Sequence, residues 1–458
     1  MLTKKASKLW YSLIVMSALL LIGGTLFLPT RTTAQTIVPN DEYALAYIPH
    51  DPIHINSNAE FLSQDAVEGW PGDGSPGNPI IISGYSFTAA DHMLRVNNSD
   101  LHFRFEDNQL DGLAQVWCGI AIVDSANGVI RNNFVRRAAA GIHVVTVENM
   151  TIQGNDVQDS TFGGIVVEDG SINVSVIGNT VYDNENCGIF LGNPYGSEPS
   201  VDVRVLDNIV HSNGPSGIDL VEVTNCLVEN NTVYSNNVNG IIVESGSNTI
   251  RNNTISSCIR GIMLTGGNST ISGNEVTNAE YGFYVGCEDN TISNNYLAHN
   301  SKTGIRFYYL STEGIGGSNN IVIENVIANN SRWGLEFLTD TENNLVQHND
   351  FLMNGYTAQA YDDGTSNTFA ENYWDDWTGP DDDLDGFVDT PYSINGTADN
   401  SDAYPLAANC NPLPSWYTTP PSTTPTGTTP SPVDPLLIAI GAGVVVVVLL
   451  AVIIVKKR

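Results

Sequence analysis

Carboxylates crowd into residues 381–389, which read Asp-Asp-Asp-Leu-Asp-Gly-Phe-Val-Asp. Hard cations such as Ca²⁺ prefer clustered oxygen ligands, and a calcium loop alternates carboxylates at its start and needs glycine at a sharp turn, here Gly386. The predicted ligands are Asp381, Asp383, Asp385 and Asp389. The closing position is Tyr392 instead of the bidentate Glu of an EF-hand. We therefore expect a structural calcium ion without paired helices, and a solvated acidic loop is the alternative.

A second group of residues could act on sugars. His211, Asp219 and Glu222 lie close together in the sequence and supply an imidazole and two carboxylates. Glycosidic cleavage uses two carboxylates that flank the bond, whereas lyase chemistry at a uronate needs a base and a cation that neutralises the substrate. These three residues are the catalytic candidates, and ordinary membership of an acidic surface is the alternative interpretation.

The elements that must position these residues follow from a repeat. Between Phe105 and Trp374 one pattern returns twelve times: an apolar residue, two positions, Asn, one position, another apolar residue. The asparagines are Asn108, Asn133, Asn155, Asn179, Asn208, Asn231, Asn253, Asn274, Asn295, Asn325, Asn349 and Asn372. After each of the first ten comes a Gly followed by Ile, Phe or Leu, as at Gly261 and Gly282. A repeat this regular must be interpreted before any single site.

The spacing of the asparagines predicts the architecture. They are mostly 21 to 25 residues apart, which is shorter than the helix-pair repeats of about 33 to 47 residues. Within each unit the apolar residues alternate with a period of two, are often β-branched, and are separated by Gly and Asn, a pattern typical of short strands and turns. Three short strands per coil, stacked at about 4.8 Å per coil, give an all-β parallel β-helix of about twelve coils and roughly 55 Å.

Stacking places the repeat residues in columns. In an inward-facing turn, each Asn amide can bond to the amide of the next coil, which satisfies polar groups that would otherwise be buried without partners. The Gly column fits a backbone position that needs positive φ or close approach of neighbouring coils. Turn marking alone is the alternative. Asn230 and Asn252 begin glycosylation sequons and precede ladder asparagines, so we expect them to point outward.

One flank of the solenoid is expected to bind ligand. Two long insertions, 193–200 and 308–318, leave the coil at the same corner, and such insertions often mark a binding face. Positions two residues after the repeat Gly face outward between them. The predicted ligand-binding residues are Phe190, Asp219, Tyr284, Arg306 and Glu336. Aromatic faces with charged groups suit sugar rings, and neutral insertions on an inert surface are the alternative.

The two ends of the sequence predict where the protein is located in the cell. Lys4, Lys5 and Lys8 precede an apolar run, as in a secretory signal, and an uncleaved anchor is the alternative. Residues 436–455 form an uninterrupted apolar stretch followed by Lys-Lys-Arg, which predicts a transmembrane helix with a cytoplasmic C-terminus. The expected parts are 1–34 signal peptide, 35–79 N-terminal cap, 80–376 parallel β-helix, 377–411 acidic C-terminal cap with the calcium loop, 412–435 Pro/Thr-rich stalk, 436–455 transmembrane helix and 456–458 cytoplasmic tail. The protein is therefore expected in the cell membrane, single-pass, with its β-helix body outside the cell.

A solenoid exposes unpaired strand edges at both ends and needs caps. At the first end, residues 57–68 predict a short helix that buries Phe61, Leu62 and Val67 over the first coil. At the far end, the aromatic run that includes Trp374 is expected to cover the last coil.

Charge excludes one class of partner. All fifty acidic residues lie within 35–435, together with eleven Lys and Arg, so this segment carries 11 − 50 = −39. A surface this acidic argues against binding of nucleic acid. It suits solubility, salt tolerance or cation binding.

Cysteines and histidines show no metal-binding pattern in the sequence. Cys118 and Cys187 occupy the same slot, directly before a repeat Gly, but three coils apart. That separation is about 14 Å, too far for a disulfide. We expect most cysteines to be small buried residues. The histidines expected to be isolated surface residues are His143, His211, His299 and His348.

Motifs near both ends of the repeats resemble those of a known group. Residues 52–61 and 72–82, the run Asn372-Tyr-Trp-Asp-Asp-Trp, and residues 389–392 and 402–406 resemble signatures of NosD-like and carbohydrate-binding or sugar-hydrolase parallel β-helix proteins, especially secreted, membrane-anchored archaeal members. The resemblance covers about 52–406 and implies a right-handed helix at the cell surface. It implies no single activity, because the group hosts lyases, epimerases, hydrolases and non-catalytic binders. Copper is not expected, since Met, Cys and His do not cluster.

Together these features predict a cell-surface β-helix that binds glycans or other envelope components through one face, without assured catalysis. A polysaccharide lyase, hydrolase or epimerase is the first alternative. A structural or adhesion protein of the envelope is the second. The oligomeric state stays open.

Overall fold

The protein is described by a computed structural model that places residues 47–113, 117–192, 198–310, 315–355, 358–377 and 379–412. The predicted signal peptide, transmembrane helix and cytoplasmic tail, and nearly all of the predicted stalk, lie outside the described residues. Within the described ranges, no helix combines the length and the apolar character needed to cross a membrane. The chain divides into units 1–48 and 49–458, with β1 (Ile48–Pro49) at their boundary, and the architecture below is that of the second unit.

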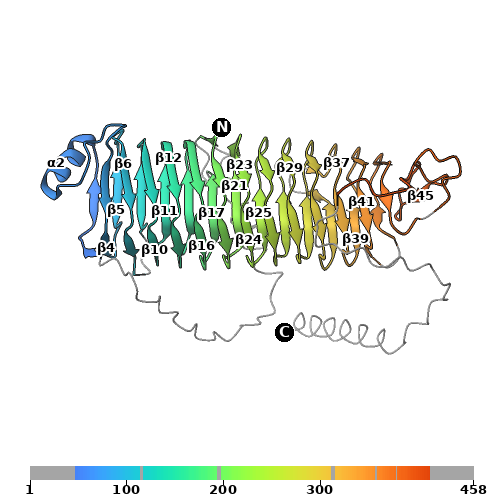
Figure 1. Cartoon of the computed structure of the whole chain (residues 1–458), viewed down its shortest axis with the longest axis horizontal. Helices are drawn as coiled ribbons and strands as arrows, with labels where there is room; N and C mark the ends of the chain where they lie inside the picture. Colours follow the sequence, from blue (N-terminus) through green and yellow to red (C-terminus); the bar gives the residue numbers. More distant parts are fainter. Residues whose placement is uncertain are drawn as a thin grey trace, which may run out of the picture. The chain divides into compact units, whose positions relative to one another are not determined.

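Three parallel sheets wind around a common core, and each coil passes through sheets 1, 2 and 3 in turn. This confirms the predicted parallel β-helix, whose coils are seen edge-on in Figure 1. Sheet 1 contains β3 (Ile80–Ser83), β6 (Phe103–Glu106), β9 (Gly128–Arg131), β12 (Glu148–Gln153), β15 (Ile172–Ile177), β18 (Ser200–Val201), β19 (Arg204–Leu206), β22 (Val223–Thr224), β23 (Leu227–Glu229), β26 (Thr249–Arg251), β29 (Thr270–Ser272), β32 (Thr291–Ser293), β37 (Ile321–Ile323), β40 (Leu345–Gln347), β43 (Thr368–Ala370), β45 (Tyr392–Ser393) and β46 (Ser401–Asp402).

Sheets 2 and 3 repeat the same strand spacing. Sheet 2 contains β4 (Tyr85–Thr88), β7 (Gln109–Asp111), β10 (Phe134–Arg136), β13 (Asp156–Gln158), β16 (Thr180–Tyr182), β20 (Ile209–His211), β24 (Thr232–Tyr234), β27 (Thr254–Ser256), β30 (Glu275–Thr277), β33 (Tyr296–Ala298), β38 (Val326–Ala328), β41 (Asp350–Leu352) and β44 (Tyr373–Trp374). Sheet 3 contains β2 (Ile53–Ile55), β5 (Leu94–Asn97), β8 (Ile120–Val123), β11 (Ala140–Val145), β14 (Gly163–Glu168), β17 (Cys187–Gly192), β21 (Ser216–Val221), β25 (Asn239–Val243), β28 (Arg260–Leu264), β31 (Tyr281–Val285), β34 (Thr303–Phe307), β39 (Trp333–Phe337) and β42 (Ala360–Asp362). Within the second insertion, β35 (Tyr309–Leu310) and β36 (Ile315–Gly316) form an antiparallel pair.

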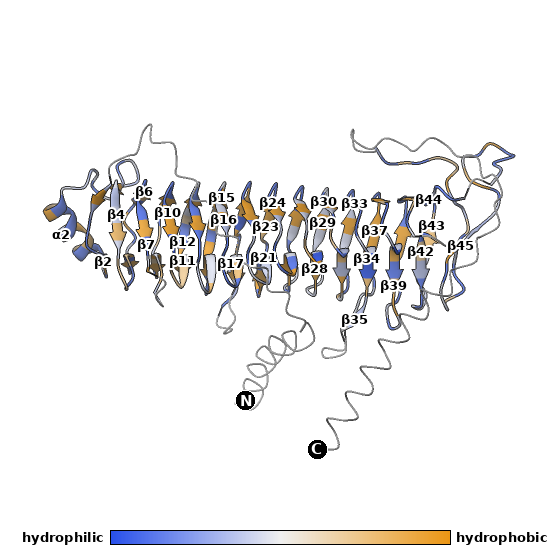
Figure 2. Cartoon of the chain, turned by 90° about the horizontal axis from the view of Figure 1, so that it is seen from below, coloured by the Kyte–Doolittle hydropathy of each residue, from blue (hydrophilic) through white to orange (hydrophobic). Residues whose placement is uncertain are grey.

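The apolar residues of the repeat form the core. In one coil, Ile250, Ile255, Ile262 and Leu264 come from all three sheets, and each is 0% exposed. Residues between them point outward, so hydrophobic and hydrophilic colours mix along the strands in Figure 2. Because the strands between the two ends of the stack have a neighbour on both sides, their backbone groups are paired over most of the described coils.

The asparagine ladder is confirmed. All twelve ladder asparagines are buried, and each of the first eleven donates its side-chain amide to the side-chain oxygen Oδ1 of the next. Asn253, for example, donates to Asn274 at 2.9 Å and to the backbone oxygen of Val228 at 2.9 Å. The ladder runs along the corner between sheets 1 and 2, where each Asn satisfies backbone as well as side-chain groups.

The residues with positive φ form a different column from the repeat glycines. The residue directly before each ladder Asn has a φ between 54° and 64°, as at Asn252 and Gly273. The repeat glycines have no positive φ; instead they allow the coils to approach. A Cβ placed on Gly188 would lie 2.7 Å from the carbonyl oxygen of Gly217. Asn230 and Asn252, at the positive-φ column, are exposed as expected.

The other two corners carry asparagine ladders that the sequence pattern did not indicate. Their side-chain amides also bond from coil to coil. The runs are Asn184, Asn213 and Asn236, then Asn300, Asn330 and Asn354, between sheets 2 and 3, and Asn290, Asn320, Asn344 and Asn367 between sheets 3 and 1. Residues such as Cys258 and Ala279 interrupt them, and this interruption hides the period in the sequence.

Helix α2 (Asn58–Glu68) lies before the first coils and begins at Ser57, whose hydroxyl accepts a hydrogen bond from the backbone N of Glu60. Phe61 is fully buried and packs against the rings of Trp70 and Phe103. The expectation that Leu62 and Val67 are also buried is wrong, because they are 44% and 82% exposed. Successive helical residues are rotated by about 100°, so these three side chains point to different sides of the helix.

At the far end, aromatic rings stack on one another. Trp374 is sandwiched between Phe351 and Tyr392, with ring centroids 4.2 Å away on both sides. Tyr392, which replaces the closing ligand of the predicted calcium loop, is thus a buried packing residue.

Candidate functional site

The outer face of sheet 3 is made of two columns of side chains. The first column lies two positions after the repeat Gly, and parallel pairing brings its members into register. It runs His143, Val166, Phe190, Asp219, Ile242, Met263, Tyr284, Arg306 and Glu336, and Tyr361 continues it in register without a preceding repeat Gly. The second column lies directly before the Gly and includes Cys187, Ser216, Asn239, Arg260, Tyr281, Thr303 and Trp333. All five predicted ligand-binding residues therefore lie on one line.

Aromatic rings and guanidinium groups interleave in the middle of this face. The guanidinium carbon of Arg260 lies 4.8 Å from the centre of the Tyr284 ring, and that of Arg306 lies 5.9 Å from the same ring. Arg306 also donates to the hydroxyl of Tyr281 at 2.8 Å. Tyr308, from the second insertion, approaches Tyr284 with a centroid distance of 4.3 Å. These contacts hold the polar and aromatic groups in fixed positions.

Glu336 occupies a different environment from the one expected. It is completely buried, with 0% exposure, because Arg306 and Arg332 both lie 3.5 Å from its carboxylate oxygens. The hydroxyl of Thr303 donates to Oε2 at 3.3 Å. A covered carboxylate cannot contact a ligand directly, so Glu336 orients Arg306 instead.

Phe190 is also more buried than expected. It is 8% exposed and packs with Ala140, Val166 and Cys187 in an apolar cluster on the outer face. The ring of Phe162 lies 6.1 Å from it and is 39% exposed. The exposed aromatic ring in this part of the face is therefore Phe162, which directly precedes β14, and not the predicted Phe190.

The column before the repeat Gly supplies residues that the sequence interpretation missed. Trp333 stacks on Tyr361 with ring centroids 5.2 Å apart, and the ammonium of Lys302 lies 5.0 Å from the Tyr281 ring. The signal was present, because Arg260, Tyr281 and Trp333 all directly precede a repeat Gly.

Asp219 is the candidate acid of the face. It is half-buried between Phe190 and Ile242, its in-register neighbours, and its Oδ1 has no hydrogen-bond partner within the described part of the chain. Burial, together with the nearby negative charge of Glu244, raises the pKa of Asp219 to about 8. Asp219 thus holds a proton at neutral pH, as a general acid requires.

The other two catalytic candidates lie away from Asp219. His211 is on sheet 2, stacked between Tyr182 and Tyr234 with centroid distances of 5.1 and 4.7 Å, so it is not an isolated histidine. Burial lowers the pKa of His211, against the opposing effect of nearby carboxylates. Glu222 is exposed at the turn after β21. The structure places the three candidates on different surfaces.

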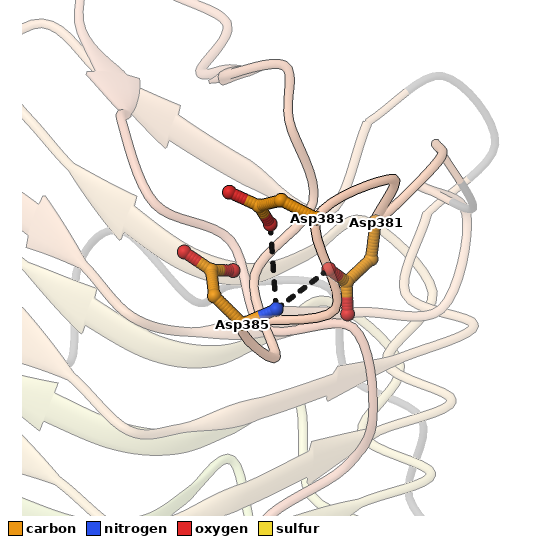
Figure 3. A group of neighbouring side chains, drawn as sticks. All are labelled: Asp381, Asp383 and Asp385. Atoms are coloured by element: carbon orange, nitrogen blue, oxygen red, sulfur yellow. Dashed lines mark hydrogen bonds between the residues drawn. The ribbon is translucent and has the colours of Figure 1, made fainter.

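The predicted calcium loop brings three carboxylates together. One oxygen of each of Asp381, Asp383 and Asp385 lies within 4.8 Å of the others, and Figure 3 shows the three side chains around the backbone N of Asp385. That N donates to Asp381 at 3.1 Å and to Asp383 at 3.3 Å. Gly386 has a φ of 94°, as the sharp turn requires. The fourth predicted ligand, Asp389, accepts a bond from the backbone N of Asp382 at 2.9 Å.

The stacked coils and their outer face define the molecule as a parallel β-helix repeat protein. The chain belongs to the family described as right handed beta helix region, which matches residues 92–255, 197–351 and 260–379. The family assignment supports the expected right-handed winding. The narrower resemblance to NosD-like archaeal members stays a prediction.

Several solved structures are similar to this chain at low identity. The A-module of the mannuronan C-5 epimerase AlgE6 of Azotobacter vinelandii is 16% identical, with a TM-score of 0.49 over 64% of this chain and 90% of that one. The tailspike protein of Escherichia coli bacteriophage HK620 is 11% identical, with a TM-score of 0.43 over 72% and 66%. An alginate lyase from Paenibacillus is 13% identical, with a TM-score of 0.35 over 69% and 97%. No curated protein sequence matches the chain.

Proposed function

We propose that the outer face of sheet 3 binds glycan chains along the stack of coils. The observation that carries this proposal is the fixed network of Tyr281, Tyr284, Arg306 and Glu336. Half-buried rings offer flat surfaces to the C–H faces of sugars, and the guanidinium N–H groups offer donors to hydroxyl or carboxylate oxygens. Coils advance by about 4.8 Å, a rise comparable to the length of one pyranose unit, so successive coils present sites to successive sugars.

Binding can be tested by affinity electrophoresis of the full chain in gels that contain neutral or uronate-rich polysaccharides. Tyr284→Ala and Arg306→Ala are expected to weaken retardation by about tenfold or more, as for residues central to an interface. Tyr182→Ala removes a comparable ring from sheet 2 and serves as the control. Equal retardation of all variants, or an equal loss with Tyr182→Ala, would refute the assignment of this face.

A second candidate function is cleavage of the bound glycan, favoured by the protonated state of Asp219. A carboxylic acid with a raised pKa can protonate a leaving glycosidic oxygen. The negative charge of Glu244 contributes to the raised pKa of Asp219 and is the second carboxylate of this candidate pair. Release of reducing or unsaturated ends by the wild type, lost in Asp219→Asn with binding retained, would assign this activity. Retention of a glycan without any new ends would assign binding alone.

We also propose that Asp381, Asp383 and Asp385 hold a calcium ion that stabilises the C-terminal cap, and that 436–455 anchors the protein in the membrane with the β-helix outside the cell. Clustered carboxylates and the turn at Gly386 support the first proposal. The second rests on sequence alone. Protease protection of the C-terminal tail in intact cells, with cleavage of the β-helix body, would test it.

A further inference from the structure

Three residues that the proposed glycan binding does not use meet at the N-terminal part of the outer face. Cys118 lies two residues before the start of β8, His143 lies in β11, and Glu168 ends β14, so three successive coils each contribute one side chain. Nδ1 of His143 lies 3.6 Å from Sγ of Cys118, and Nε2 lies 2.9 Å from Oε2 of Glu168. His143 is therefore not an isolated surface histidine, as the sequence had suggested.

The order thiol, imidazole, carboxylate has a chemical meaning. A nucleophile is activated when a base lies beside it and a third group fixes the orientation of that base. Glu168 accepts the Nε2–H of His143, which leaves Nδ1 facing the sulfur. Side-chain exposures of 25% for His143 and 12% for Glu168 place the pair in a partly covered site that a small substrate can still reach.

The charges around the thiol agree with this geometry. Burial alone would raise the pKa of Cys118, but hydrogen bonds and charges from His143 and His92 lower it to about 6. Burial would lower the pKa of His143, but Cys118 and Glu168 raise it to about 9. Between these values the thiolate–imidazolium pair is the dominant form. The other facing imidazole, His92, has its ring 5.0 Å from Trp117.

Other cysteines of the chain differ from Cys118. Cys187 occupies the same slot three coils later but is buried, and burial raises its pKa well above the usual value. Cys410 is exposed beside Asp350, and its pKa is raised to about 12 by burial of the sulfur and by that carboxylate. Among the described residues, Asp381, Asp383 and Asp385 form the one group of three metal-type ligands within 4.8 Å, so the Cys118 group does not have the compactness of a metal site.

The surroundings indicate the substrate. The apolar cluster of Ala140, Val166, Cys187 and Phe190 has Cys118 packed at its edge. Trp117, next to Cys118 in the sequence, is 48% exposed, and Phe162, whose ring lies 6.1 Å from that of Phe190, is 39% exposed. Apolar groups beside a nucleophile suit the acyl part of an ester better than a charged substrate.

We propose that Cys118, with His143 as its proton-transfer partner and Glu168 as the positioning residue, forms a thiol acyl-transfer site that cleaves carboxylic esters. The thiolate attacks the carbonyl carbon, a C–S bond forms, and the carbonyl electron pair moves to oxygen. Collapse of this adduct breaks the C–O bond, and the alkoxide takes the proton from Nδ1 of His143 and leaves as the alcohol. Water then attacks the thioester while Nδ1 accepts its proton. The C–S bond breaks, the acid is released, and the thiolate–imidazolium pair is restored.

The test uses the full chain and p-nitrophenyl acetate. The expected result is a burst of one equivalent of nitrophenolate per chain and one acetyl group on the peptide that contains Cys118. Cys118→Ala is expected to abolish both, and His143→Gln to slow acylation by about 10²- to 10⁴-fold. Cys410→Ala, which removes an exposed thiol beside a carboxylate, is expected to retain the burst. Absence of acetyl on Cys118, or wild-type acylation in His143→Gln, would overturn the proposal.

Alkylation of the unmodified chain keeps the proposal testable if a variant does not fold. Iodoacetamide is expected to label Cys118 at pH 7 at least about tenfold faster than Cys410, since the thiolate is the reactive form. Glu168→Gln is expected to shift the pH profile of this labelling upward, which a merely structural carboxylate would not do. If one equivalent of zinc blocked the labelling, a metal-binding role would replace the esterase assignment. If Cys118 were labelled but transferred no acyl group, a redox role would replace it.

Discussion

Asp402 receives the last hydrogen bond of the asparagine ladder, because the side-chain amide of Asn372 donates to its Oδ2 at 3.1 Å. The backbone N of Asn372 and the indole N of Trp374 donate to the same oxygen at 2.9 and 3.1 Å. Asp402 is 0% exposed. A carboxylate only accepts, so it ends a chain of donating amides without leaving a donor of its own unpaired.

Asp402→Ala is expected to lower the free energy of unfolding by about 2–4 kcal/mol, because several buried donors would lose their partner. The measurement is chemical denaturation followed by circular dichroism. Glu342→Ala removes an exposed acid and is the control, with an expected change within about 0.5 kcal/mol. Equal effects of the two variants would show that Asp402 does not terminate the ladder energetically.

Asn253→Asp and Asn252→Asp make the same chemical change at adjacent residues. Asn253 is buried and donates to Asn274, whereas Asn252 is exposed with a φ of 55° that Asp also tolerates. Asn253→Asp should cost about 3 kcal/mol or more, since it buries an acceptor where a donor is required. Asn252→Asp should change stability by about 0.5 kcal/mol or less. Thermal melts of the two variants compare the ladder with its neighbouring column.

Glu336→Gln should weaken glycan binding although Glu336 is covered. The change removes the charge that holds Arg306 and Arg332, each 3.5 Å away, and should lower the unfolding free energy by about 1–3 kcal/mol. Affinity for a bound polysaccharide and stability should both fall. Arg332→Ala removes only the more exposed partner, so it should retain more of the binding. Unchanged binding in Glu336→Gln would mean that Arg306 keeps its position without this carboxylate.

Stability should depend on the ionisation of Asp219. Its pKa is raised from 3.8 to about 8 in the folded chain, so between these values the unfolded chain binds fewer protons than the folded chain. The contribution of Asp219 to stability is therefore lost as pH rises from about 4 to 8. The melting temperature of the wild type relative to Asp219→Asn should fall across this window. Asp91→Asn, at an exposed position, should follow the wild type; a parallel course of wild type and Asp219→Asn would contradict the raised pKa.

Calcium should raise the melting temperature of the full chain. At about 100 times its dissociation constant, an ion bound only to the folded state adds about 2.7 kcal/mol. Asp383→Asn should remove most of this gain, while Asp382→Asn, in the same loop but outside the group of three, should keep it. Calorimetry with and without a chelator measures the effect. Identical melting curves in both conditions would leave the loop as a solvated acidic turn.

The sequence predicts those parts of the structure in which one residue type recurs without interruption. Asn253 and its equivalents recur in all twelve repeats, so the sequence predicted their ladder. The repeat Gly recurs in the first ten, so the sequence also predicted that Tyr284, two residues after such a Gly, lies on the outer face. The ladder at the corner occupied by Asn184 and Asn300 was not predicted, because Cys258 and Ala279 stand between them and conceal the period. Alternation of apolar residues thus suffices for the sheets and for one ladder.

Contacts between side chains on different coils were out of reach. Glu336 is covered by two arginines, Arg306 from the neighbouring strand of sheet 3 and Arg332 from its own coil. No local sequence pattern indicates that these side chains lie beside Glu336. The contact between Cys118 and His143 also joins side chains of two neighbouring coils, so it depends on how the strands of these coils are offset from each other. Residue spacing gives the column of a side chain, whereas its environment depends on lengths of side chains one coil away.

The coils that contain Asn253 and Asn274 have the same length, since the ladder bonds from each to the next span 21 residues. Any such segment begins and ends on equivalent backbone positions. Deleting one whole turn here would rejoin Asn231 with a chemically identical acceptor and leave every remaining amide in register, whereas deleting a few residues inside a strand would shift the rest of that strand out of register. Length in this molecule can therefore change by duplication or loss of complete modules, and the reach of its ligand-binding surface would change in the same discrete increments.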